Sequence, residues 1–218
     1  MPETIKFLGG VRTVTGSSHL ITTAHSSILI DCGLFYGRRN EFYEQNTRFD
    51  FKPQKLNALV LSHAHIDHCG NIPSLISRGL RCKIYTTSAT KDLCRLMLED
   101  SGKVQEEDTR YVNKINRRLG QPLRKPLYTQ NEGRRAIRRF RPLSYRQRLK
   151  IAKDIMCTFY DAAHILGSGV IVLDIARRKS RDLRIGYAVD LGRKGLPLLN
   201  DPTVLEGLDY LILESTYG

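Results

Sequence analysis

Four residues with metal-binding side chains lie within six positions of residues 62–70, Ser-His-Ala-His-Ile-Asp-His-Cys-Gly. In an extended segment, residues two apart point the same way, so His63 and His65 can face one metal ion. Asp67 and His68 follow after the chain turns and can approach a second ion. Imidazole and carboxylate ligands suit zinc, and also manganese or iron. Two ions about 3.5–4 Å apart can activate water and polarise a phosphoryl or carbonyl oxygen.

The residues around this cluster predict the elements that hold it. The apolar residues 58–61 predict a buried strand, and residues 72–77 predict a short helix after a turn. The cluster therefore follows the carboxyl end of a strand, where a rigid framework commonly presents a site to a crevice. This context favours a metal site over a solvated loop that happens to contain histidines.

Four other predicted strands also end in a residue of a metal-binding type. The strands and the residues after them are 26–30 with Asp31, 156–160 with His164, 183–189 with Asp190, and 210–213 with Glu214. We expect strands of one sheet to bring these ends to one edge. His164 would give the first ion a third imidazole, Asp190 would bridge both ions, and Asp31 would orient a histidine ring by a hydrogen bond.

The other patterns complete a single α/β domain over residues 1–218. Further strands are predicted at residues 5–8, 19–23, 82–86 and 169–175. An amphipathic helix is expected at residues 89–107, and residues 34–56 predict a long loop with one helical turn.

The excess positive charge lies in one segment. The net charge is +13, and residues 110–150 hold fourteen of the 35 basic residues but one of the 22 acidic ones, which leaves 21 of each sign elsewhere. We expect residues 105–150 to form a basic excursion from the core, starting as a helix at residues 111–119.

A localised basic excess interleaved with aromatic residues is typical of a surface that binds nucleic acid. The alternative is a solvated insertion that only aids solubility. Because the charge is concentrated in one segment, we favour RNA binding over this alternative. The residues expected to contact it are Arg117, Arg118, Arg134, Arg135, Arg138 and Arg139.

Composition argues against several other classes of protein. The 218 residues with 41% hydrophobic content suit one soluble domain. Five scattered cysteines without a Cys-x-x-Cys pair argue against a disulfide framework and a thiolate zinc site. No segment is apolar enough to span a bilayer, and the N-terminus lacks the features of a signal peptide. We therefore expect a cytoplasmic protein without a membrane partner.

Taken in order, the motifs resemble those of the metallo-β-lactamase superfamily, and within it the β-CASP RNA-processing nucleases. The matching stretches are 9–19 with 30–33 for the first motif, 61–70 for the second, 163–168 for the third, 190–192 for the fourth, and 213–218 for the acidic motif that opens the β-CASP region. Ala163 and Val189 stand where the family commonly has glycine.

The resemblance implies an αββα-sandwich with two divalent metal ions, zinc above all. His63, His65 and His164 would hold one ion, and Asp67, His68 and Asp190 the other. Asp31 and Glu214 would support the ligands without binding a metal. That branch includes the nuclease subunit of the cleavage and polyadenylation machinery and prokaryotic RNA-processing exonucleases.

Members of that family continue with a β-CASP insert that clamps RNA, and then complete the first domain with a late histidine for the second ion. The resemblance covers only the front part of such an enzyme, without the insert. We therefore expect a sandwich incomplete at its C-terminal side and a partly formed second metal site. An open sheet edge would also favour a homo-oligomer or a complementing subunit.

Three functions of different classes follow. The first is a metal-dependent ribonuclease with Asp67 as the catalytic base or orienting group. The second is a small-molecule metallo-hydrolase acting on a thioester or lactone, which the metal site alone does not exclude. The third is a truncated homologue that binds RNA or a partner without catalysis. The basic segment and the ending at residues 214–218 favour the first.

Overall fold

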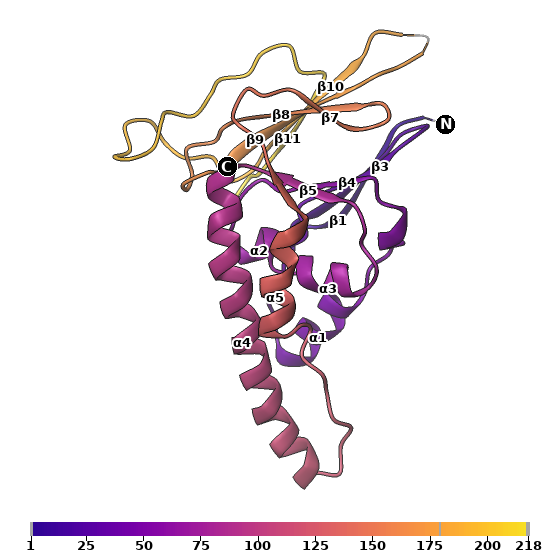
Figure 1. The fold of residues 1–218 in the computed structure, drawn as a ribbon, viewed down its shortest axis with the longest axis vertical. Helices are drawn as coiled ribbons and strands as arrows, with labels where there is room; N and C mark the ends of the chain where they lie inside the picture. Colours follow the sequence, from indigo (N-terminus) through magenta and orange to yellow (C-terminus); the bar gives the residue numbers. More distant parts are fainter. Residues whose placement is uncertain (1, 179, 217–218) are drawn as a thin grey trace.

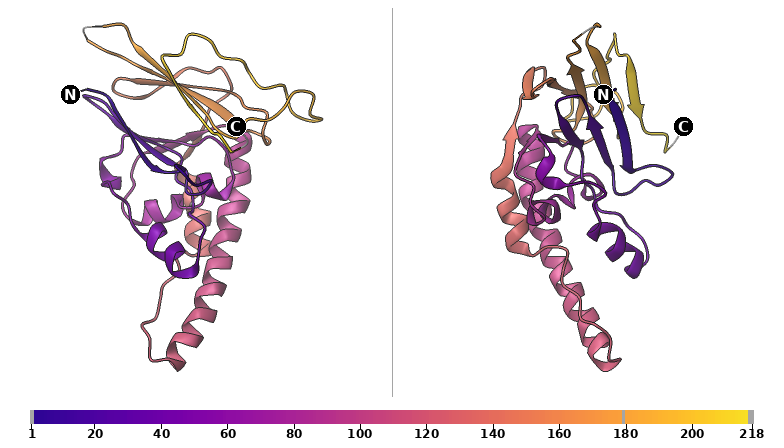
Figure 2. Two further views of the ribbon diagram at one scale, coloured as in Figure 1. Left: turned by 180° about the vertical axis from the view of Figure 1, so that it is seen from behind. Right: turned by 90° about the vertical axis from the view of Figure 1, so that its right-hand side faces the viewer.

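Two β-sheets stack face to face, and the helices lie on the side of one of them (Figures 1 and 2). The structure, a computed structural model, describes residues 2–178 and 180–216, with the side chain of Arg39 set aside. Tyr217 and Gly218 of the predicted acidic motif lie outside the described residues. The predicted α/β sandwich is confirmed.

The six-stranded sheet has the order β1-β2-β3-β4-β5-β6, and the five-stranded sheet has the order β11-β10-β9-β8-β7. The first contains β1 (Thr4–Gly9), β2 (Ser18–Thr22), β3 (Ser27–Ile30), β4 (Ala58–Val60), β5 (Lys83–Thr86) and β6 (Phe140–Pro142). The second contains β7 (Leu149–Ala152), β8 (Ile155–Asp161), β9 (Gly169–Ile175), β10 (Leu183–Ala188) and β11 (Tyr210–Leu213).

The helices are α1 (Arg39–Thr47), α2 (Ile66–Cys69), α3 (Ile72–Ser77), α4 (Ser88–Arg118) and α5 (Gln130–Ala136), with 3-10 turns at Pro53–Lys55 and Ile137–Arg139. No helix of the described part of the chain is long and apolar enough to cross a membrane.

Alternation along the central strands divides the core into two layers. Ile28 and Ile30 of β3 and Val60 of β4 face the five-stranded sheet, while Leu29 and Leu59 face the helices. A strand buried on both faces must be apolar throughout, which is why residues 58–61 carry no polar side chain. Strands β3 to β6 run parallel, so their carboxyl ends share one edge of the sheet.

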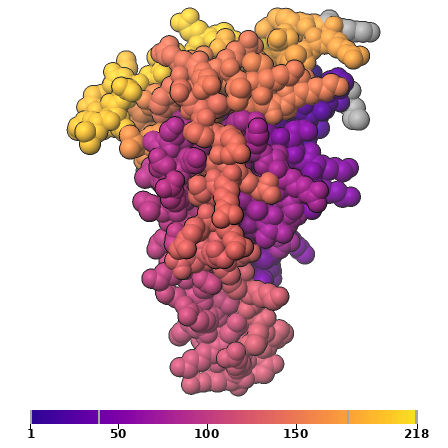
Figure 3. Space-filling view, in the orientation of Figure 1, coloured from indigo at the N-terminus to yellow at the C-terminus, as the bar shows by residue number. Residues whose placement is uncertain are grey.

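Part of the basic segment lies in the crossover between two parallel strands. Strand β5 leads through α4 and α5 into β6, its parallel neighbour. Helix α5 packs so closely on α4 that a Cβ added to Gly133 would lie 2.2 Å from the carbonyl oxygen of Leu98. Tyr128 and Phe140, which flank α5, are fully buried. The part of the segment around α5 therefore belongs to the helical layer. The part around the C-terminal end of α4 projects from the molecule (Figure 3).

Helix α4 is longer than the sequence patterns indicate. The predicted helices at residues 89–107 and 111–119 are one continuous helix of 31 residues, about 46 Å long. The hydroxyl of Thr87 caps its first turn by accepting the backbone N–H of Thr90. Glu132, the single acidic residue of residues 110–150, closes a capping box with Thr129 at the start of α5.

Three elements differ from the sequence-based expectations. The loop predicted at residues 34–56 contains the nine-residue helix α1, which is almost entirely polar and has no amphipathic period to reveal it. Strands β6 and β7 were not predicted, because β6 has three residues including a proline and β7 includes a lysine. Their pairing partners, rather than their own sequences, define them as strands.

Candidate metal centre

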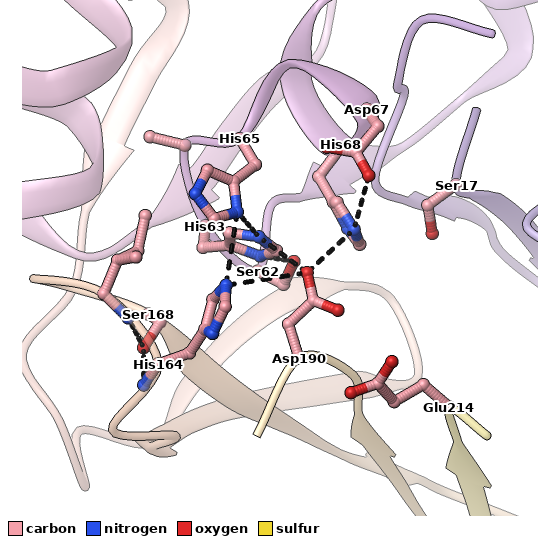
Figure 4. Close-up of polar contacts among 12 residues, drawn as sticks. Ser17, Ser62, His63, His65, Asp67, His68, His164, Ser168, Asp190 and Glu214 are labelled. Carbon is pink, nitrogen blue, oxygen red and sulfur yellow. Dashed lines mark hydrogen bonds and ion pairs between the residues drawn. The ribbon is translucent and has the colours of Figure 1, made fainter. Parts of the chain in front are cut away.

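The six predicted metal ligands come together at one edge of the sandwich (Figure 4). His63 and His65 follow β4, and Asp67 and His68 lie on α2. His164 follows β8 and Asp190 follows β10. The expectation that one sheet delivers all of these residues is wrong, since β4 belongs to the six-stranded sheet and β8 and β10 to the other. The site therefore depends on how the two sheets stack.

Four of these side chains form a compact group. Ligand atoms of His63, His65, His164 and Asp190 all lie within 4.8 Å of one another. His65 Nδ1 is 3.0 Å from His63 Nε2 and 3.2 Å from His164 Nε2. Asp190 Oδ2 is 3.0 Å from His63 Nε2 and 3.8 Å from His164 Nε2.

These separations suit a shared cation. Ligands about 2.0–2.1 Å from a tetrahedral zinc ion are roughly 3.3 Å apart, close to the spacing of the nitrogens and oxygen here. The 3.0 Å contact between His63 Nε2 and His65 Nδ1 is a hydrogen bond when one of the two nitrogens carries a proton, and a cation bound by both lone pairs would take the place of that proton. Three nitrogens and one carboxylate oxygen are also the donor types that zinc prefers.

A second group lies beside the first and shares Asp190. His68 Nε2 is 3.3 Å from Asp190 Oδ2 and 3.8 Å from Asp67 Oδ2. Burial would lower the pKa of His68, but hydrogen bonds to Asp190 and Asp31 outweigh it and raise the pKa to about 10. Burial likewise opposes ionisation of Asp190, yet His63 and His68 hold its pKa well below the usual range. Asp31 and Asp190 therefore stabilise a positive charge on His68.

Asp31 holds His68 directly by a hydrogen bond and His63 through the hydroxyl of Ser62. It is fully buried and accepts hydrogen bonds from the backbone N–H and the hydroxyl of Ser62, each at 2.8 Å. Its Oδ2 lies 2.8 Å from His68 Nδ1. Burial would raise the pKa of Asp31, but the hydrogen bond to His68 and the donors of Ser62 outweigh it and lower the pKa. Asp31 thus contacts His68 as the predicted orienting role requires, and that role stays a prediction.

The hydroxyl of Ser62 settles which nitrogen of His63 faces the cluster. The single hydroxyl proton goes to Asp31, so Ser62 Oγ accepts from the Nδ1–H of His63, 3.0 Å away. The lone pair of His63 is then on Nε2, which points to His65 and Asp190. Sequence reasoning gave Ser62 no role, although its place directly before His63 was the available signal.

Two glycines allow the backbones of neighbouring ligand loops to approach closely. A Cβ on Gly33 would lie 1.5 Å from the carbonyl oxygen of Asp67, and a Cβ on Gly192 would lie 1.6 Å from that of Ala163. The first contact locks α2 against the end of β3. The second locks the His164 turn against the Asp190 turn, where the N–H of Gly192 also donates to the carbonyl of Ala162.

The backbone bends sharply beside the ligands. Asp31, Ala163 and Asp190 have φ values of 57°, 56° and 49°, in the left-handed region that favours glycine. Ala163, predicted to stand at a glycine position, thus has a left-handed conformation, while Val189 is not among the residues with positive φ. Left-handed conformations cost about 1–2 kcal/mol per residue, so the surrounding contacts must hold these turns in place.

Helix α4 anchors the His164 loop. The backbone N–H groups of His164 and Ile165 donate to Ser168 Oγ, at 3.0 and 3.2 Å. Thr87 and Thr90, at the first turn of α4, donate their hydroxyl protons to the carbonyl of Gly167, at 2.7 and 2.8 Å. The base of the longest helix is therefore bonded directly to a ligand loop.

The remaining predicted residues lie farther from the ligands. Glu214 points toward the site below Asp190 (Figure 4), and its hydrogen bond comes from Thr216 Oγ1 at 2.8 Å. Its supporting role stays a prediction. Arg117 and Arg118 lie in the last turn of α4, about 42 Å along the helix from Thr90.

The other four arginines lie on α5 or in the 3-10 turn that follows it. Arg134 forms an ion pair with Glu99 of α4, and Arg139 donates to the carbonyl of Arg81 at 2.7 Å. Arg135 and Arg138 are exposed. Arg117 and Arg118 thus lie far along α4 from the His164 loop, and the role of all six arginines in binding RNA stays a prediction.

An unpredicted groove of about 580 Å³ lies beside α4. Its walls are α1, α4 and residues 124–127, and its lining includes Asp100, Asp108 and Ile66, which is next to the ligand Asp67. Arg124 stacks over the ring of Tyr43, 5.2 Å from its centroid, and Lys125 lies on the same wall. Only the fold places these residues together, because α1 and residues 124–127 are far apart in sequence.

Residues 11–102 match the family described as "Metallo-beta-lactamase superfamily". The chain is 33% identical over 210 residues to "Ribonuclease TTHA0252" of Thermus thermophilus. The aligned residues make up 96% of this chain and 43% of that protein. The chain is therefore similar to the metallo-beta-lactamase superfamily. Two proteins of Methanocaldococcus jannaschii, "Transcription termination factor FttA" and "Probable RNase MJ4", are each 29% identical over 98% of this chain. The resemblance to the superfamily's RNA-processing branch is thereby confirmed.

The superfamily fold is also seen in solved structures. A metallo-beta-lactamase of Cronobacter sakazakii, the S60 mutant of a protein with a HARLDQ motif, superposes with a TM-score of 0.54 over 90% of this chain and 64% of that one. At 20% identity this likeness shows the fold alone. The chain spans less than half the length of the curated relatives named above, at 43%, 31% and 45%.

Proposed function

We propose that this chain carries the metal centre of a ribonuclease that hydrolyses RNA with two divalent ions, zinc being the best candidate. The observation that carries the proposal is the convergence of His63, His65, His164 and Asp190 within 4.8 Å. The names of two relatives, a ribonuclease and a probable RNase, support RNA as the substrate.

The donor atoms divide between the two ions. His63 Nε2, His65 Nδ1 and His164 Nε2 would hold the first, Asp67 and His68 would hold the second, and Asp190 would contribute to both. When bound, the ions would lower the pKa of water and stabilise the charge that develops on the phosphoryl oxygens.

The protein's own groups would position and deprotonate the attacking water. Asp67 suits the base, because its carboxylate is 29% exposed and its Oδ2 lies 3.8 Å from His68 Nε2. Asp31 and Ser62 would keep the imidazoles of His68 and His63 in their binding orientation. Burial and the fixed hydrogen bonds mean that little rearrangement is needed when the substrate binds.

The groove and the basic segment supply a path for the RNA. Arg124 and Lys125 line the groove, as do Tyr36 and Tyr43, and Asp100 and Asp108 line it on the α4 side. The basic and aromatic residues outside α4 would suit a single strand, because phosphates pair with cations and bases stack on rings.

RNA cleavage in zinc- or manganese-containing buffer tests this function. We expect His65→Ala and Asp67→Ala to lower the cleavage rate by about 10²–10⁴-fold, in the range of lost general-base catalysis. His25→Ala, which removes an exposed histidine from a turn far from the cluster in sequence, is the matched control and should leave the rate unchanged. Cleavage by His65→Ala at the wild-type rate would contradict the proposal, and turnover of esters instead of RNA would favour a small-molecule hydrolase.

A further inference from the structure

A buried tyrosine of the second sheet contacts the carboxylate that orients His68. Tyr187 lies on β10 and is 1% exposed. Its hydroxyl donates to Asp31 Oδ2 at 2.9 Å, although Asp31 follows β3 of the other sheet. This hydrogen bond crosses the interior of the sandwich directly behind the ligands.

The direction of the hydrogen bonds here is fixed. The single proton of the Tyr187 hydroxyl goes to Asp31, so the hydroxyl of Ser17, 2.8 Å away, must donate to Tyr187. Ser17 is held in turn, because its N–H donates to the carbonyl of Asp67 and its own carbonyl accepts the N–H of Gly33. The Ser17 hydroxyl therefore links Tyr187 to the loop that carries Asp67.

Asp31 Oδ2 accepts three donors, which are Ser62 Oγ, His68 Nδ1 and Tyr187 Oη. Three donors from separate elements fix the position of this oxygen. The Nδ1–H of His68 donates to it, so the orientation of the imidazole ring is fixed as well. The opposite nitrogen, Nε2, then faces Asp190 Oδ2 at 3.3 Å.

Strand β10 acts on both nitrogens of His68. Through Tyr187 it holds the carboxylate that binds Nδ1, and three residues later it delivers Asp190, which faces Nε2. Because both groups come from one strand end, a shift of the five-stranded sheet would disturb both contacts together. We propose that Tyr187 is a positioning residue that sets His68 for the second metal ion and ties the two sheets in register at the site.

This inference rests on the proposed two-metal function, so its test includes a readout that needs no metal. Tyr187→Phe removes only the hydroxyl. Tyr128→Phe is the matched control, because Tyr128 is equally buried and donates to Ser101 Oγ at 2.8 Å, away from the ligands. Zinc titration with a competing chelator gives the affinities, and imidazole ¹H–¹⁵N spectra of the metal-free protein report exchange of the Nδ1–H proton of His68.

In Tyr187→Phe we expect the second zinc ion to bind about 10–100-fold more weakly while the first is unaffected, as when a hydrogen-bonding partner of a ligand is lost. The Nδ1–H proton of His68 should exchange faster with water. Tyr128→Phe should change neither. Unchanged proton exchange, or equal losses in both variants, would overturn the proposal. If wild-type protein binds no second ion, the two-metal function fails, and the imidazole spectra alone decide the role of Tyr187.

Discussion

The metal-binding edge and the far end of α4 are built in opposite ways. At the edge, loops from both sheets press together, and Asp31 is fully buried with donors on both oxygens. At the far end of α4, Arg117, Arg118 and Leu119 are exposed, and a Cβ on Gly120 would meet nothing within 4 Å. Several contacts therefore fix each side chain at the metal-binding edge, whereas the exposed side chains at the far end of α4 have few contacts to hold them.

The largest expected effect comes from removing the buried charge of Asp31. Asp31→Asn puts an amide beside donors that need an acceptor and leaves His68 without its counter-charge. Breaking a buried pair in this way costs about 3–5 kcal/mol of unfolding free energy. Asp92→Asn, in an exposed pair with Arg95 on α4, should cost less than about 1 kcal/mol. Urea denaturation measures both, and equal losses would abolish the contrast.

Glycine substitutions should show the same contrast. Gly33→Ala forces a Cβ into the backbone of Asp67, and we expect a loss of about 3 kcal/mol or more. Gly120→Ala meets only the strain of a left-handed φ of 64°, about 1 kcal/mol. Thermal unfolding of the two variants measures the difference. A Gly33→Ala protein as stable as Gly120→Ala would mean that the α2 loop is not locked.

The base of α4 should respond more mildly, although it connects the two regions. Thr90→Val removes one of the two hydroxyl donors to the carbonyl of Gly167 and keeps the side-chain shape. We expect about 1 kcal/mol of lost stability, the usual worth of one hydrogen bond. The affinity for the first zinc ion should fall with it, because the His164 loop is loosened. An unaltered zinc affinity would show that α4 does not support this loop.

The smallest effect on stability should come from the arginines at the end of α4. A double Arg117→Glu, Arg118→Glu variant should stay within about 0.5 kcal/mol of wild type, as for exposed substitutions. Its RNA affinity should fall, and the slope of log affinity against log salt should shrink by about 0.7 for each lost phosphate contact. Fluorescence anisotropy at several salt concentrations measures this. An Arg95→Glu variant near the other end of α4 is the control, and equal losses in both would argue against a specific contact at this end.

Much of this architecture could be predicted because single strands carry their own signals. The alternation and apolar runs of β3, β4, β8 and β10 mark strands, and each is followed by a ligand-type residue. Local spacing explains why His63, His65, Asp67 and His68 were recognised together. The sequence also predicted that His164 and Asp190 lie close to these residues. It placed all of them on one sheet, whereas the structure divides them between two.

The remaining features depend on contacts distant in sequence. Tyr187 has no motif around it that indicates a hydrogen bond to Asp31, 156 positions away. The continuity of α4 was hidden because its apolar face changes neighbours, from the helical layer to residues 122–124, to which Asn113 and Asn116 are hydrogen-bonded. The groove likewise exists only after α1 and residues 124–127 are folded against α4.

Residues from two sheets are proposed to form one metal centre, and the zinc content of the purified protein shows whether they do. Purified protein is saturated with zinc, desalted and measured by elemental analysis, beside His65→Ala and His25→Ala. We predict one tightly bound ion per chain in wild type and His25→Ala, with a weaker second ion seen by titration, and loss of the tight ion in His65→Ala. A wild-type chain that retains no zinc, or a tight ion that survives in His65→Ala, would contradict the account.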